Sequence, residues 1–362
     1  MSNWPSWLPI REQLRPLTPY GAPQVPANAR LNTNENPYGP SKELAAAIAK
    51  RVSEVAEGLN RYPDRDATNL RTKLVDYLQK QTGVQLALEN VWAANGSNEI
   101  LQSIFLAFGS AKALGFLPSY SMHPLIGKVA NVEWVDGLRN SDFTLNIDIC
   151  LNQIKEVKPA LTFITTPNNP TGTSVSILEM EQLAKATADV NGLLIVDEAY
   201  AEFSTEKSAI TLIAEYPNIL VSRTMSKAFA FAGVRVGYLA ANKSVIDAIQ
   251  LVRLPYHLSS LTQAAAEVAL DFQDELLAEV AKLASDRDQV AKALVEMGLQ
   301  VVPSNANFIL FSGFKQSSNE LWQKLLAQGV LIRDVGLPGY LRVTIGNEAE
   351  NQAFLNALKG AL

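Results

Sequence analysis

Short apolar runs alternate with stretches of helical periodicity through the middle of this chain, and this alternation limits the folds it can adopt. The apolar runs lie at residues 91–94, 161–165, 193–196, 219–222 and 234–241. Helical stretches at residues 97–108 and 178–190 follow two of them. Compact apolar runs separated by helices are typical of parallel strands that are buried on both faces. The sequence therefore predicts an α/β fold with a mostly parallel central sheet flanked by helices.

The N-terminal segment has a different character. Residues 1–40 carry prolines at positions 5, 9, 16, 19, 23 and 26, a density that favours extended backbone over helix. The same segment carries Trp4, Trp7 and Tyr20, which is more apolar surface than a solvated tail usually exposes. We therefore predict an N-terminal arm that packs on a small domain or on a partner subunit.

Two domains are predicted beyond the arm. Ser41 is a good N-cap for a helix that opens a large domain over residues 41–250. A long helical region at 262–297 ends at Gly298 and belongs to a smaller α/β domain over residues 251–362. Its predicted strands lie at 300–302, 308–311, 330–334 and 341–345, and its predicted helices lie near 320–327 and 349–358.

Composition narrows the class of protein. A chain of 362 residues with 48% hydrophobic and 19% charged residues suits a compact protein of about two domains. A net charge of −5 argues against binding to nucleic acid or to an anionic membrane surface, so anionic ligands must be met by local arginines and backbone N–H groups.

Localisation and metal binding also follow from a few residues. No apolar run approaches the roughly 20 residues of a membrane span, and the N-terminus lacks the features of a secretion signal. Cys150 is the only cysteine, and its apolar surroundings favour a buried, unreactive thiol. His123 and His257 stand far apart with no metal-ligand spacing around them. We expect a cytoplasmic protein with no metal site.

Polar motifs stand where the predicted strands end, which is where open α/β sheets bind ligands. In AANGSNE a helix begins at Ser97 and Asn98, and the N–H groups at such a terminus favour a phosphate by about 0.3–2 kcal/mol. In TPNNPTG the side-chain amide of Asn169 is well placed to donate to a fixed ligand oxygen, although an ordinary Asn-Pro turn explains the motif equally well.

The next two strand ends carry ionisable groups. Asp197 ends the apolar strand in LLIVDEAY, where a carboxylate is poorly solvated unless a cation meets it. A structural aspartate is the commoner explanation of such a residue when it is taken alone. The motif SRTMSK brings Thr224, Ser226 and Lys227 together, and Arg235 follows as a possible bidentate phosphate ligand. The order of these features along one chain is more specific than any one of them.

That order identifies a resemblance. The chain is similar to fold-type-I, class II aminotransferases that depend on pyridoxal 5′-phosphate, and within them it resembles the histidinol-phosphate aminotransferase family along essentially its whole length. The matching segments are LTPYG, LNTNENP, NRYPD, GSNE, PSYSMHP, TPNNPTG, VDEAYAEF, RTMSKAFAFAGVRVGY, LIRD and LRVTIG. The GSNE and SYSMH segments differ from the more widespread forms of those loops.

The resemblance implies roles at the cofactor. Lys227 would form a Schiff base with pyridoxal 5′-phosphate and then move the substrate proton, while Asp197 would pair with the pyridine nitrogen. Asn169 and Tyr200 would bind the phenolic oxygen, and Tyr120 would stack on the ring. The phosphate would be held by the backbone amides of Ser97 and Asn98 and by Thr224, Ser226 and Arg235.

The resemblance also implies a partner and a substrate site. Tyr62 would reach the cofactor phosphate of the neighbouring subunit, which makes a homodimer necessary for activity. Arg342, assisted by Arg333, would bind the phosphate of histidinol phosphate and then the carboxylate of glutamate. The imidazole side would be lined by Tyr20, Asn36 and Tyr256. The implied reaction converts L-histidinol phosphate and 2-oxoglutarate into imidazole acetol phosphate and L-glutamate in histidine biosynthesis.

Other functions are weighed against this one. An aromatic amino-acid aminotransferase would share the cofactor site, and a phosphothreonine decarboxylase would share much of the sequence pattern. An aminotransferase-like domain of a transcription regulator is disfavoured, because such domains follow a basic DNA-binding domain and this chain is acidic. A nucleotide-binding oxidoreductase is disfavoured because no G-x-G-x-x-G motif follows a predicted strand.

Overall fold

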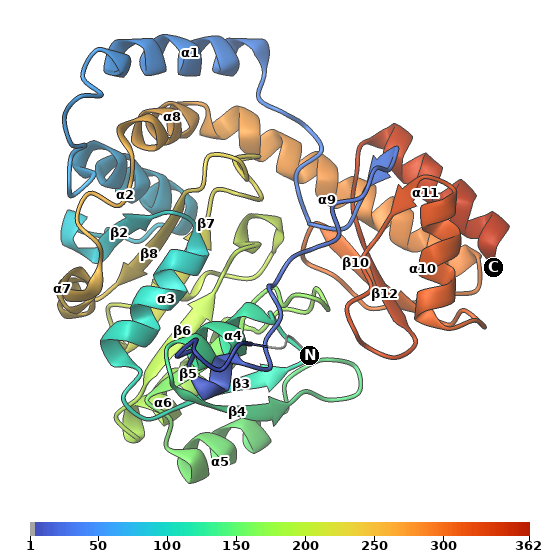
Figure 1. Cartoon of the computed structure of the whole chain (residues 1–362), viewed down its shortest axis with the longest axis horizontal. Helices are drawn as coiled ribbons and strands as arrows, with labels where there is room; N and C mark the ends of the chain where they lie inside the picture. The colour runs from blue at the N-terminus through green and yellow to red at the C-terminus, as the bar shows by residue number, and fades with distance from the viewer. Residues whose placement is uncertain (1–3) are drawn as a thin grey trace.

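A twisted central sheet forms the body of the protein in a computed structural model that describes residues 4–362 (Figure 1). Its strand order is β2-β8-β7-β6-β5-β3-β4. Every neighbouring pair is parallel except those made by β8, which runs antiparallel to both β2 and β7. The strands are β2 (Val91–Ala94), β3 (Lys112–Leu117), β4 (Glu133–Leu138), β5 (Leu161–Thr165), β6 (Leu193–Asp197), β7 (Ile219–Thr224) and β8 (Gly237–Ala241). The predicted α/β architecture is confirmed.

Helices cover both faces of this sheet because the strand side chains that point to either face are apolar. Alternate side chains of the strands fall into two separate buried clusters, one on each face. One face packs against α3 (Ser97–Phe108), α4 (Met122–Val129) and α7 (Lys243–Val252). The other packs against a set that includes α2 (Thr68–Thr82), α5 (Ile147–Val157), α6 (Ile177–Asp189) and α8 (Ser260–Asp271). Helix α1 (Lys42–Ala56) lies on α8, and the Ser41 side chain caps it as predicted.

A second, smaller sheet lies beside the first (Figure 1). Its strands β9 (Gln300–Val301), β10 (Phe308–Ser312) and β12 (Tyr340–Thr344) are antiparallel, with β10 in the middle. Helices α9 (Gln273–Glu296) and α10 (Ser318–Ala327) pack against it, and α11 (Glu348–Ala361) packs on these two helices. No helix among residues 4–362 has the length and apolar character needed to cross a membrane.

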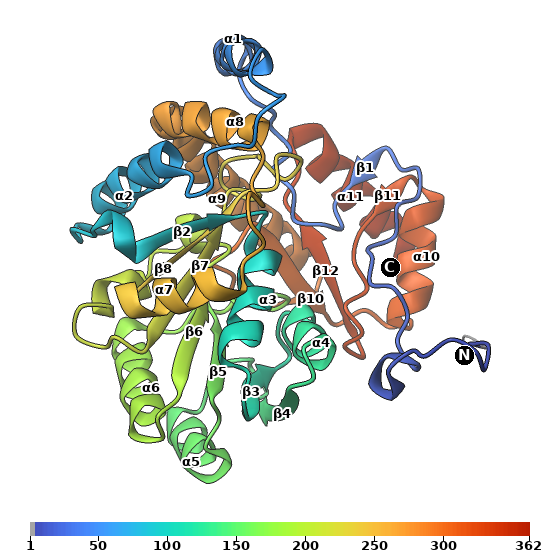
Figure 2. The same cartoon turned by 60° about the vertical axis from the view of Figure 1, so that its left-hand side comes forward.

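The N-terminal arm begins beside α4 of the large unit and then runs to β11 beside the small sheet (Figure 2). Near its start a short 3-10 turn, Glu12–Leu14, packs on α4, and the Arg11 guanidinium donates to the Val129 carbonyl at 2.7 Å. Further along, β1 (Ala29–Arg30) pairs in parallel with β11 (Val330–Leu331). The arm therefore contacts both units of the chain.

Several details differ from the sequence expectations. The helical region predicted at 262–297 is broken at Phe272, whose backbone leaves the helical range at φ −102° and ψ 19°. The last strand predicted for the large sheet begins at Gly237 rather than at residue 234, because Arg235 adopts a left-handed conformation with φ 63°. Strands β3 and β4 were not predicted. Glu133 and Leu138 at the two ends of β4 are exposed, so that this edge strand lacks the fully apolar pattern of the central ones.

Candidate functional site

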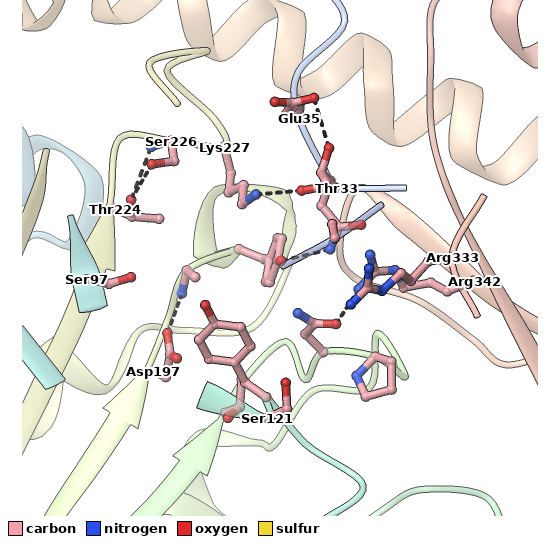
Figure 3. Close-up of a pocket in the computed structure, with 18 of the residues that line it drawn as sticks. Thr33, Glu35, Ser97, Ser121, Asp197, Thr224, Ser226, Lys227, Arg333 and Arg342 are labelled. Carbon is pink, nitrogen blue, oxygen red and sulfur yellow. Dashed lines mark hydrogen bonds between the residues drawn. The ribbon is translucent and has the colours of Figure 1, made fainter. Parts of the chain in front are cut away.

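A cavity of about 440 Å³ opens where the parallel strands of the large sheet end (Figure 3). Three parts of the chain enclose it: the strand-end loops, the arm around residues 32–35, and residues 333–335 with Arg342 from the small unit. Most of the predicted site residues line it, namely Tyr20, Ser97, Asn98, Tyr120, Asn169, Asp197, Tyr200, Thr224, Ser226, Lys227, Arg235, Arg333 and Arg342. Asn36, Tyr62 and Tyr256 are not part of this lining.

Lys227 follows β7 and points its amine into the cavity. The Nζ atom donates to the carbonyl oxygen of Thr33 at 3.0 Å. Burial lowers the pKa of the Lys227 amine to about 8, and the positive charges of Arg342 and Arg235 act in the same direction. At pH 8 about half of such amines are neutral, against roughly one in 300 for a lysine with the ordinary pKa of 10.5. The chain thus presents a lysine that is nucleophilic near neutral pH.

Asp197 ends β6 with both carboxylate oxygens held in place. One oxygen lies 2.9 Å from Nε2 of His123, and the other accepts from the backbone N–H of Ala199 at 3.2 Å. His123, from α4, is 1% exposed and packs among aromatic rings. The sequence does not predict this partner, because the absence of metal-ligand spacing around His123 indicates no other role for it. Its position in the PSYSMHP segment, beside Tyr120, was the available signal.

The N-terminus of α3 and the loop after β7 together form an anion cradle. The first N–H groups of α3, including those of Ser97 and Asn98, have no partner within the helix. Gly96 adopts φ 79°, and a Cβ atom on it would meet Nη2 of Arg235 at 2.7 Å. The Thr224 hydroxyl donates to Ser226 Oγ at 3.0 Å, and Arg235 Nη1 donates to the same oxygen at 3.4 Å. Backbone donors, hydroxyls and a guanidinium therefore converge as a phosphate group requires.

Asn169 and Tyr200 are bonded to residues of the small unit and of the arm, respectively. The Oδ1 atom of Asn169 accepts from Arg342 Nη1 at 2.6 Å, which leaves the amide N–H₂ of Asn169 free to donate. The Tyr200 hydroxyl accepts from Nδ2 of Asn34 at 2.8 Å. Burial raises the pKa of Tyr200 to about 12, so the phenol stays protonated at neutral pH. Both side chains can therefore donate a hydrogen bond to an oxygen in the cavity.

Two arginines form a cationic end of the cavity. Arg342 donates from Nη2 to the carbonyl of Asn32 at 2.8 Å, but its buried Nε has no partner among the described residues. Burial lowers the pKa of the Arg342 guanidinium to about 10. The backbones of Arg333 and Arg342 bond to each other, so both side chains start from one place and extend into the cavity. A buried guanidinium with an unpaired donor indicates a site for an anion.

Three predicted residues lie elsewhere. The Asn36 Oδ1 atom accepts from the backbone N–H of Tyr38 at 3.0 Å, and the asparagine of this loop that lines the cavity is Asn34. Tyr62 and Tyr256 stack on each other with ring centroids 4.4 Å apart. They are 79% and 41% exposed, so two aromatic rings project from the surface as a pair.

Comparisons with known proteins agree with this geometry. Residues 28–358 match the family model described as aminotransferase class I and II. The histidinol-phosphate aminotransferase of Mycolicibacterium smegmatis is 55% identical over 353 residues, which cover 97% of this chain and 92% of that protein.

Two solved structures share the fold. The histidinol-phosphate aminotransferase of Sinorhizobium meliloti, solved in complex with pyridoxal-5′-phosphate, has a TM-score of 0.85 at 23% identity and covers 98% of this chain and 97% of that one. The L-threonine-O-3-phosphate decarboxylase of Porphyromonas gingivalis has a TM-score of 0.77 at 23% identity, covering 92% and 98% of the two chains. At this identity the two likenesses establish the fold and leave the reaction open.

Proposed function

The chain belongs to the class I and II aminotransferase family, whose enzymes depend on pyridoxal 5′-phosphate, and we propose that it is a histidinol-phosphate aminotransferase. The proposed reaction transfers the amino group of L-histidinol phosphate to 2-oxoglutarate. Its products are imidazole acetol phosphate and L-glutamate, in the biosynthesis of histidine. A relative of that name is 55% identical over nearly the full length of both chains.

One observation in the cavity supports this substrate most directly. The cavity has two separate anion sites, the cradle at α3 and the arginine pair at Arg342 and Arg333, with Lys227 in the same cavity. A cofactor phosphate in the cradle leaves the arginines for the substrate. Their cluster suits a phosphate on one substrate and a carboxylate on the other, as two successive half-reactions require.

The residues of the cavity fit the cofactor. When bound, pyridoxal 5′-phosphate supplies a ring that withdraws electrons from the carbon bonded to the amino group. The Asp197 carboxylate would keep the ring nitrogen protonated, and His123 would hold that carboxylate in position. Asn169 and Tyr200 would donate to the ring oxygen, and Tyr120 would stack on the ring. Lys227 would bind the cofactor and carry the substrate proton between carbon atoms.

Activity assays distinguish the proposed reaction from two others, aromatic amino transfer and phosphothreonine decarboxylation. Purified protein should be assayed with 2-oxoglutarate and either histidinol phosphate or phenylalanine, with kcat/KM measured for each. We expect kcat/KM for histidinol phosphate to exceed that for phenylalanine by about two decades or more, because a phosphate brings more charge and more acceptor oxygens to the arginine pair than the single carboxylate of phenylalanine does. A preference for phenylalanine would identify an aromatic aminotransferase. Release of carbon dioxide from phosphothreonine without a keto product would identify a decarboxylase.

We also propose that the enzyme is a homodimer with shared active sites. The exposed pair of Tyr62 and Tyr256 lies outside the cavity of its own chain, which supports a contact with a partner. In this arrangement Tyr62 would reach the cofactor phosphate in the partner's cavity, and Tyr256 would reach the imidazole side of the substrate there. We place the dimer in the cytoplasm, where the buried Cys150, whose pKa burial raises to about 11, stays a thiol.

A heterodimer tests this sharing. One subunit would carry Tyr62→Ala and the other Lys227→Ala, with different tags for purification after co-expression. One of its two cavities would combine an intact Lys227 with an intact Tyr62 from the other subunit, so the heterodimer should show about half of the wild-type activity at limiting cofactor. If Tyr62 acts within its own chain, the heterodimer would instead show about half the activity of the Tyr62→Ala homodimer.

A further inference from the structure

Asn34 lies at the centre of a buried hydrogen-bond chain that ends at the cavity. Its Nδ2 atom donates to the Tyr200 hydroxyl at 2.8 Å, and its Oδ1 accepts from the Thr344 hydroxyl at 2.9 Å. The backbone N–H of Asn34 in turn donates to Thr344 Oγ1 at 3.0 Å. All three residues are less than 5% exposed, so the polar groups of this chain must satisfy one another or a ligand.

The chain of bonds has a defined direction. Because Thr344 Oγ1 already accepts from a backbone N–H, its own proton is free, and Asn34 Oδ1 is its acceptor. Turning the Asn34 amide over would place Nδ2 against this hydroxyl and leave the Thr344 proton without an acceptor. The amide of Asn34 is therefore oriented with its N–H₂ group toward Tyr200, whose oxygen must accept.

An accepting Tyr200 has its own proton left over. Among residues 4–362 no acceptor lies within hydrogen-bonding distance of that proton, and Tyr200 lines the cavity. The proton is thus available to an oxygen within the cavity. Without the hydrogen bond from Asn34, the Tyr200 hydroxyl could either accept from or donate to a ligand group in the cavity.

The backbone of Asn34 is also held in a special conformation. Its φ is 54°, in the left-handed region that asparagine tolerates better than most residues. The Asn307 side chain donates to the Asn34 carbonyl at 3.1 Å and secures this turn. The two residues before it accept from Lys227 and Arg342 through their carbonyls, so one short segment of the arm contacts three groups of the cavity (Figure 3).

We propose that Asn34, oriented by Thr344, is a positioning residue that makes Tyr200 a hydrogen-bond donor to the phenolic oxygen of the cofactor. This inference rests on the proposed function. A donor stabilises the negative charge on that oxygen, and this lowers the pH at which the lysine-bound cofactor loses its proton. Through Asn34 the arm and β12 of the small unit therefore influence the acidity of a cofactor bound in the large unit.

The test is a pH titration of the visible absorption band of the cofactor-loaded protein without substrate. Asn34→Asp keeps the shape of the side chain but offers only acceptors, so the Tyr200 proton should turn to the new carboxylate and leave the cavity. Loss of this hydrogen bond to a charged group should raise the midpoint of the titration by about one to two pH units. Tyr200→Phe should raise it by a similar amount.

The added charge of Asn34→Asp also raises the midpoint, and a double-mutant cycle separates the two effects. In a Tyr200→Phe background only the charge effect is left, so Asn34→Asp should shift the midpoint by about one to two units less than in the wild type. Asn36→Asp adds the same charge two residues along the loop, where the side chain bonds to the backbone of Tyr38, and calibrates the charge effect. Equal shifts in the two backgrounds would overturn the proposal.

A second variant covers the case in which Asn34→Asp does not bind the cofactor. Thr344→Val keeps the shape of the side chain but removes the proton that orients the Asn34 amide. It should raise the midpoint in the wild-type background and leave it unchanged with Tyr200→Phe; no shift in the wild-type background would refute the role of Asn34. A wild-type protein without any visible band would overturn the proposed function and this inference together. If the double-mutant cycle gives the expected shifts but the protein does not act on histidinol phosphate, only the substrate assignment is overturned.

Discussion

Replacement of Lys227 by alanine is expected to abolish both the visible absorption band of the cofactor-loaded protein and amino transfer. The amine is the only one that lines the described cavity, and its pKa of about 8 makes it reactive near neutral pH. Without it the cofactor has no covalent attachment, and the substrate proton has no base to carry it. Loss of the two roles should lower kcat/KM by ~10⁴-fold or more.

A matched control separates chemistry from folding. Lys185→Ala removes an exposed lysine from α6, no residue of which lines the cavity, and should leave band and rate unchanged. Lys227→Arg keeps the positive charge but cannot form the same attachment, and it should be as inactive as Lys227→Ala. Retention of a borohydride-sensitive band in Lys227→Ala would show that another amine binds the cofactor.

Replacement of Asp197 by asparagine should give the second largest effect. The carboxylate is 2% exposed, and the ring nitrogen beside it would be a buried cation without a counter-charge once the charge is removed. Breaking a buried pair in this way costs about 3–5 kcal/mol. At 1.36 kcal/mol for each factor of ten, kcat/KM should fall by roughly two to four decades.

The comparison for this variant is Asp189→Asn, at an exposed position at the end of α6. It removes the same charge outside the cavity and should leave kcat/KM within a factor of about two. The cofactor band of Asp197→Asn should persist, because Lys227 is intact. A rate for Asp197→Asn close to that of the wild type would show that the ring nitrogen is not paired with this carboxylate.

The strand-end residues of the cavity could be predicted from sequence for a simple reason. Parallel strands place their carboxyl ends along one edge of the sheet, so Asn169, Asp197 and Lys227 had to lie near one another once β5, β6 and β7 were recognised. The apolar character of these strands made them recognisable. Strand β4 includes charged and exposed residues, so its pattern resembles that of a loop. Strand β3 is buried from Ala113 to Phe116, but this apolar stretch is short and contains Gly115.

Contacts between residues that lie far apart in the sequence could not be predicted from sequence patterns. His123 and Asp197 are 74 positions apart, and neither segment has a sequence feature that predicts the other as its partner. The choice between Asn34 and Asn36 also needed coordinates, because a left-handed φ at Asn34 turns its side chain toward Tyr200 and no periodicity encodes that turn. The arrangement of the arm over the cavity likewise depends on a strand pair, β1 with β11, of only two residues each.

A half-reaction followed by absorbance decides whether this enzyme transfers the amino group of histidinol phosphate. Cofactor-loaded protein should be mixed with L-histidinol phosphate in the absence of 2-oxoglutarate. We predict that the visible band falls in step with the formation of an equal amount of imidazole acetol phosphate, and that 2-oxoglutarate then restores the band with release of glutamate. A band that histidinol phosphate leaves unchanged, in a protein whose band phenylalanine discharges, would contradict the proposed function.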